Sequence, residues 1–89
     1  MNPIIQKNNE QNVLEKQYQK RTGKIIEKTG DGFTIEQDGL EIVARVTPDV
    51  FKLVNVGDNV NVYAPSFFRT PVPNSPLITK GTAVVEKLN

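Results

Sequence analysis

The sequence predicts an all-β protein: a small five-stranded barrel with one short helix between the third and fourth strands. Three observations lead to this prediction. From Gly23 onward, apolar and polar residues alternate with a period of two, as they do in half-buried strands. Turn residues such as Asp38-Gly39 separate the alternating runs at short intervals. The 89 residues allow one small domain with a thin core.

The first 21 residues differ in composition from the rest of the chain, because eight of them are Asn or Gln. Leu14 and Tyr18 are four residues apart and would share one helix face, so a helix is predicted over residues 10–21. It is too short and polar to be stable alone. We therefore divide the chain into a polar arm, residues 1–21, and a barrel domain, residues 22–89. The arm is either a solvated tail or a contact with a neighbouring subunit through Leu14 and Tyr18.

The first three strands are predicted as a meander. The TGDG stretch at residues 29–32 is a turn, and Asp38-Gly39 is a type I′ hairpin signal. Alternation points the apolar residues of these strands inward and Glu41 and Arg45 outward. The inward residues are Phe33, Ile35, Leu40, Ile42, Ala44 and Val46.

A short helix is predicted next, because Thr47 can cap it, Pro48 suits its first position and Asp49 complements its dipole. Val50, Phe51 and Val54 would face the sheet. The fourth strand covers residues 59–64, a long loop follows over 65–81, and the fifth strand covers 82–88. Their predicted inward residues are Val60, Val62, Ala64, Ala83 and Val85.

Three strands, a helix, a strand, a long loop and a strand is the layout of an OB-fold. An SH3-like barrel is the competing topology, but it usually places its helical turn between the last two strands. The stretch GKIIEKTGDGFTIEQDGLEIVARV, with VGDNVNVY and GTAVVEKL, resembles OB-like barrels of phage tail and baseplate components and the soluble domain of NfeD-type proteins. This resemblance covers about two thirds of the chain and implies the fold and an assembly role.

The composition excludes several chemistries. The chain has no cysteine and no histidine, so disulfides, thiolate metal sites and imidazole-based triads are absent. Ser66 and Ser75 therefore have no histidine to activate them. The carboxylates near the hairpin turns, Asp31, Glu36, Asp38 and Glu41, are interpreted as solvated acids. We expect no enzyme activity, no metal and no cofactor.

The charge distribution weakens a nucleic-acid role. Residues 1–22 carry four basic and two acidic side chains, residues 23–65 four basic and seven acidic, and residues 66–89 three basic and one acidic. The predicted barrel body is thus acidic, whereas nucleic-acid binding needs a continuous basic surface. No apolar run exceeds three residues, and residues 1–11 do not form a secretory signal, so we expect no membrane insertion and a cytoplasmic protein, or one assembled into a virion-like particle.

The loop over residues 65–81 is the predicted binding site. Its four prolines order an extended path, and adjacent residues of an extended chain point to opposite sides. One of Phe67 and Phe68 should therefore pack on the barrel while the other faces a partner beside Arg69. Tyr63 and Lys80 would extend this surface.

The sequence thus predicts a non-catalytic structural or adaptor subunit that binds a protein partner or forms a homo-oligomer. The alternative is an OB-fold protein that binds single-stranded nucleic acid by stacking bases on Tyr63, Phe67 and Phe68 beside Arg69 and Lys80. Turn amides near Gly30 and Gly32 that bind an anion are a third interpretation.

Overall fold

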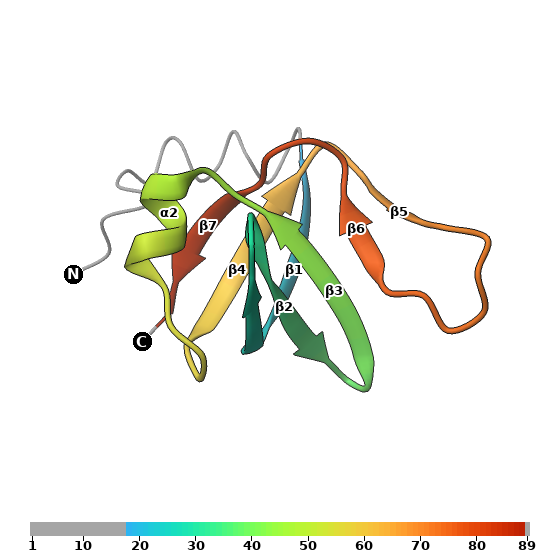
Figure 1. Ribbon diagram of the computed structural model, residues 1–89, viewed down its shortest axis with the longest axis horizontal. Helices are drawn as coiled ribbons and strands as arrows, with labels where there is room; N and C mark the ends of the chain where they lie inside the picture. The colour runs from blue at the N-terminus through green and yellow to red at the C-terminus, as the bar shows by residue number, and fades with distance from the viewer. Residues whose placement is uncertain (1–17, 89) are drawn as a thin grey trace.

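The computed structural model describes residues 18–88, which form one seven-stranded sheet and one short helix (Figure 1). The elements are β1 (Gln19–Thr29), β2 (Gly32–Gln37), β3 (Leu40–Arg45), α2 (Pro48–Leu53), β4 (Asn59–Ala64), β5 (Phe67–Arg69), β6 (Leu77–Thr79) and β7 (Val84–Lys87). The strand order across the sheet is β5-β6-β3-β2-β1-β4-β7. The predicted all-β class is confirmed. Within residues 18–88, no helix is long and apolar enough to cross a membrane.

Strand β1 is longer than expected and serves two neighbours. Its first half, residues 19–24, pairs with β4, and its second half, residues 24–29, pairs with β2. Gly23 lies near the crossover, where a Cβ would collide with the carbonyl oxygen of Glu36. Because β1 begins at Gln19, the last residues of the predicted arm are strand rather than helix. The rest of the predicted helix, with Leu14, lies outside the described residues.

The Asp38-Gly39 hairpin and the capped helix are both confirmed. Asp38 and Gly39 have φ values of 52° and 83°, as a type I′ turn requires. At the start of α2, the Val50 amide donates to the Thr47 hydroxyl at 3.4 Å. At its end, the Lys28 ammonium donates to the carbonyl oxygens of Phe51 and Val54 at 2.7 and 2.8 Å. The lysine therefore satisfies carbonyls that the short helix leaves unpaired.

The core lies on one face of the strongly curved sheet and is closed at one end by α2 (Figure 1). Every residue predicted to point inward is buried or packs against this core. The fully buried side chains include Ile25, Phe33, Ile35, Ile42, Val54, Val60, Val62 and Val85. Glu41 and Arg45 are exposed, as alternation predicted.

The five-stranded barrel is not confirmed, because the hydrogen-bonded ladder has two ends, β5 and β7. The expected long loop contains two further strands, β5 and β6, which pair antiparallel as a hairpin. β6 also pairs parallel with β3. The C-terminal segment contains two strands with a break between them: β6 pairs with β3, and β7 pairs with β4. The hairpin projects from the body on the side away from α2 (Figure 1).

Candidate functional site

The β5–β6 hairpin is held by short-range hydrogen bonds in its connecting loop. The Ser75 hydroxyl donates to the Thr70 carbonyl at 2.9 Å, and the Ser75 amide donates to the Val72 carbonyl at 3.2 Å. Asn74 supplies the left-handed residue of this loop, with a φ of 63°. At the other end, the Lys80 amide donates to the Ser66 carbonyl at 2.9 Å. The hairpin is thus fixed at both ends, although its strands are only three residues long.

The two adjacent phenylalanines point to opposite sides, as predicted. Phe67 is half-buried against the core, and the Arg21 guanidinium lies 5.7 Å from the centre of its ring. Phe68 is 44% exposed. The first ring therefore anchors the hairpin to the body, and the second is presented on the surface.

Phe68 belongs to an apolar row that crosses three strands. It pairs with Ile78 on β6, which pairs in turn with Val43 on β3. Val43 lies between the core residues Ile42 and Ala44, so its side chain is on the face opposite the core. We call Phe68, Ile78 and Val43 the outer row. It ends at the buried Thr34 of β2, which pairs with Val43.

Charges of both signs flank the outer row. On one side Glu41 lies directly opposite Glu36, and Glu36 also pairs with Lys24 of β1. On the other side, Arg45 lies 3.7 Å from Asp31 in an exposed ion pair, which contributes little to stability. The surface around the row is therefore mixed rather than basic.

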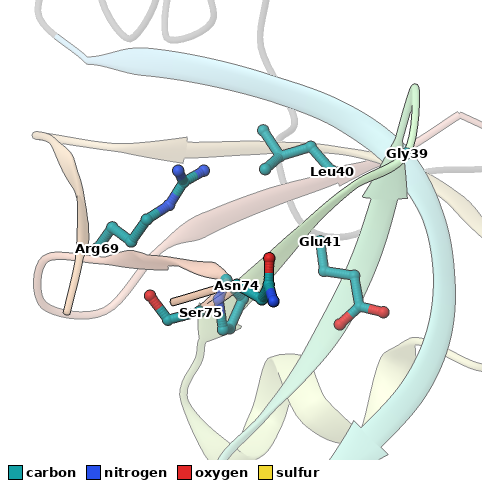
Figure 2. A pocket seen from close by; sticks show the side chains of 7 residues that line it. Gly39, Leu40, Glu41, Arg69, Asn74 and Ser75 are labelled. Carbon is teal, nitrogen blue, oxygen red and sulfur yellow. The ribbon is translucent and has the colours of Figure 1, made fainter. Parts of the chain in front are cut away.

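A groove of about 410 Å³ opens between the β2–β3 turn and the β5–β6 loop (Figure 2). It exists because β3 and β6 are parallel, so the turn before β3 and the loop before β6 lie at the same end of the sheet. Arg69 lies on the β5 side and Glu41 on the β3 side (Figure 2). The groove is lined by Gly39, Leu40, Glu41, Arg69, Asn74, Ser75 and Pro76.

The other predicted site residues lie in different places. Tyr63 is not on the surface: its exposed fraction is 0%, and its hydroxyl donates to Glu86 at 3.2 Å. Its position on β4, between Lys20 of β1 and Val84 of β7, covers its ring from both sides. The prediction that Tyr63 belongs to an exposed stacking surface is therefore wrong. Tyr18 is half-buried in a bend just before β1.

Arg69 and Lys80 are exposed near opposite ends of the hairpin, and neither makes an ion pair within residues 18–88. They lie on either side of the Phe68 position along the strands, since Arg69 pairs with Leu77 and the Lys80 amide bonds to Ser66. The predicted set therefore divides between two faces: Lys80 is in phase with Phe68, whereas Arg69 is in phase with Phe67. The expected placement of the exposed ring beside Arg69 on one face is thus wrong.

Sequence reasoning missed Val43 and Ile78. A signal for Val43 was present, because an apolar residue occupied an outward position of β3. Ile78 lay in the stretch interpreted as a loop, so nothing in the local pattern connected it to Phe68. The pairing of β6 with both β3 and β5 makes that connection.

The groups considered for other chemistries can also be located within residues 18–88. The Ser75 hydroxyl is used within its own loop, and no three carboxylates among residues 18–88 are grouped to hold a metal ion. At the β1–β2 turn, a Cβ on Gly32 would collide with the Ala44 carbonyl oxygen, and Asp31 lies 3.7 Å from Arg45. Anion binding at this turn stays a prediction.

The chain was compared with protein-family models, curated proteins and solved structures, and none of them matches it.

Proposed function

We propose that this chain is an OB-like, non-catalytic structural or adaptor subunit that docks another protein against the outer row. The exposed ring of Phe68, continued by Ile78 and Val43, is the observation that carries the proposal. Aromatic side chains are enriched among the residues that dominate binding energy at protein interfaces. The sequence resembles OB-like barrel components of phage tails, so an assembly of that kind is one setting for such a subunit.

The OB-like interpretation rests on the last third of the chain. β6 and β7 are treated as one strand, interrupted at residues 80–83, that passes from β3 to β4. Ala83 supports this continuity, because its amide donates to the Arg45 carbonyl of β3 at 2.7 Å. The position of α2 before β4 also favours this topology over an SH3-like barrel.

Mixed charge around the outer row favours a protein over nucleic acid. The adjacent acids Glu36 and Glu41 lie on the same face and would repel phosphates. A binding surface with an apolar centre and a polar rim of both signs is typical of protein interfaces. Phe68 and Lys80 keep single-stranded nucleic acid as the second candidate, because bases stack on exposed aromatic rings.

Site-specific photo-crosslinking tests the docking surface. Phe68 is replaced by benzoylphenylalanine, and the matched control carries the same group at Val56, an apolar position in the turn after α2 that is 59% exposed. We expect a covalent adduct with a different protein from position 68 and none from position 56. Identical adducts from both positions would show that the outer row has no special role.

The captured protein is then titrated with purified wild type and with the Phe68→Ala variant. We expect the variant to bind at least about tenfold more weakly, as for a central aromatic contact. In parallel, labelled oligonucleotides are titrated at two salt concentrations. Tight binding that weakens steeply with salt, together with unchanged protein affinity in the variant, would replace the docking proposal with the nucleic-acid candidate.

A further inference from the structure

The free edge of β5 offers backbone groups for pairing. In an antiparallel ladder, alternate residues point their N–H and C=O groups toward the partner strand. The bond from the Lys80 amide to the Ser66 carbonyl sets the alternation, so Ser66 and Phe68 face β6. The N–H and C=O groups of Phe67 and Arg69 therefore point outward, and no backbone hydrogen bond to them on that side occurs within residues 18–88.

Prolines limit this free edge on both sides. Pro65 and Pro71 each lie three residues from Phe68. By alternation, their backbone nitrogens point to the same outward side as those of Phe67 and Arg69, but proline has no N–H to donate there. Proline at such positions normally prevents uncontrolled pairing of edge strands. Only a short segment centred on Phe68 remains able to pair.

The segment Pro65-Ser66-Phe67-Phe68-Arg69-Thr70-Pro71 is self-complementary about its centre. If two copies pair antiparallel with Phe68 opposite Phe68, Phe67 of each copy lies opposite Arg69 of the other. These two pairs exchange four backbone hydrogen bonds, and each places a guanidinium beside an aromatic ring. Ser66 then lies opposite Thr70, so two hydroxyl residues meet. Pro65 lies opposite Pro71, where neither strand needs a donor.

We infer that β5 is the contact through which a second copy of this chain binds, by two-fold antiparallel pairing centred on Phe68. This inference rests on the proposed role of the hairpin in protein contacts and names one partner for its edge. The pairing is isologous, as most homodimer contacts are. It joins two outer rows into one continuous apolar surface, because the Phe68 rings meet on the face that carries Ile78 and Val43.

The self-association should be weak. An interface confined to two three-residue strands and their rings falls below the roughly 1,200 Å² at which interfaces of standard size begin. Such contacts form and dissociate readily and become important at high local concentration, as in a larger assembly. The dimer is therefore expected at high protein concentration only.

Mixed disulfide trapping tests the pairing and its register, because the chain has no cysteine of its own. Ser66→Cys and Thr70→Cys variants are prepared separately and mixed in equal amounts in a glutathione redox buffer. In the proposed register these positions form a non-hydrogen-bonded pair, whose Cα spacing suits a disulfide. We expect the disulfide between the two different variants to exceed both homodisulfides combined.

A Val56→Cys variant serves as the exposed control and should form no preferred disulfide. Random collision would give the heterodisulfide in an amount equal to the two homodisulfides together, and parallel pairing would favour the homodisulfides. Either result would overturn the inference. Circular dichroism of each variant confirms that the fold is kept.

Two substitutions of Arg69 separate the backbone contribution to self-association from the side-chain contribution. Arg69→Ala removes the contact between guanidinium and ring, whereas Arg69→Pro also removes an outward N–H without disturbing the bonds to β6. Sedimentation velocity should show the proline variant to be the weaker of the two in self-association. Equal self-association of wild type and Arg69→Pro would contradict edge pairing. Arg69 pairs with Leu77 and is in phase with Phe67, so its side chain lies on the face opposite the outer row. Loss of the dimer with retained partner docking would therefore separate this inference from the proposed function.

Discussion

The two edge strands of the sheet, β7 and β5, differ in how they are attached to the body. The β7 edge is tied to the body: the Lys87 ammonium lies 3.4 Å from the Asp58 carboxylate, and the Leu88 amide donates to the Asn59 carbonyl at 2.8 Å. Glu86 of the same strand accepts hydrogen bonds from Asn61 and Tyr63. The β5 edge has an exposed ring, prolines at each side, and backbone groups of Phe67 and Arg69 that have no backbone partner within residues 18–88. The β7 edge is thus fixed to the body by side-chain contacts, and the β5 edge is the one that we propose to bind other chains.

The largest loss of stability is expected when the buried Val85 of β7 is truncated. Val85 is fully buried in the core cluster, so Val85→Ala removes two methyl groups and leaves a cavity. We expect the free energy of unfolding to fall by about 2 kcal/mol, measured by urea denaturation. A change below the error of the measurement would mean that β7 is not part of the cooperative core.

Phe67→Ala should have an intermediate effect. Phe67 is only half-buried, but its ring packs against the core and is covered by Arg21. We expect a loss of about 1–2 kcal/mol in the free energy of unfolding, because roughly half of a phenylalanine's burial is removed. If the loss equals that of Phe68→Ala, the two rings do not have the distinct roles assigned to them.

Two lysines, one in β7 and one in the β5–β6 hairpin region, provide a matched pair of substitutions. Lys87→Met removes the half-buried ion pair with Asp58 and should lower the free energy of unfolding by about 1 kcal/mol. Lys80→Met, directly after β6 of the hairpin, removes an exposed side chain that makes no ion pair within residues 18–88. It should change the free energy of unfolding by less than about 0.5 kcal/mol. Urea denaturation of both variants checks the difference, and equal effects would contradict it.

Phe68→Ala should have the smallest effect on stability. The ring is exposed, so its removal should change the free energy of unfolding by less than about 0.5 kcal/mol. Partner binding and self-association should nevertheless be lost, since both use this ring. A stability loss of 2 kcal/mol or more would assign Phe68 to the fold instead of to recognition.

Much of the body could be predicted because its signals are local. The Asp38-Gly39 turn sets the register of β2 and β3, and Thr47, Pro48 and Asp49 specify the start of α2 within three residues. Alternation then identified the core side of each longer strand. These features need no knowledge of distant contacts.

The hairpin and the outer face could not be predicted in the same way. β5 and β6 are three residues long, and β6 is specified by parallel pairing with β3, more than 30 residues earlier in the chain. Tyr63 occupies an outward position by alternation, yet it is buried because the strands on both sides cover it and Glu86 binds its hydroxyl. The burial of an outward residue depends on its neighbours in space, which a single strand pattern does not specify.

Residue-resolved amide hydrogen exchange at several protein concentrations tests the role of the β5 edge most directly. The Phe68 amide should exchange slowly at every concentration, because it bonds to β6. The amides of Phe67 and Arg69 should exchange rapidly in dilute solution and slow down as the concentration rises and copies pair. Slow exchange of Phe67 and Arg69 in dilute solution, or fast exchange that no concentration changes, would contradict an open edge used for binding.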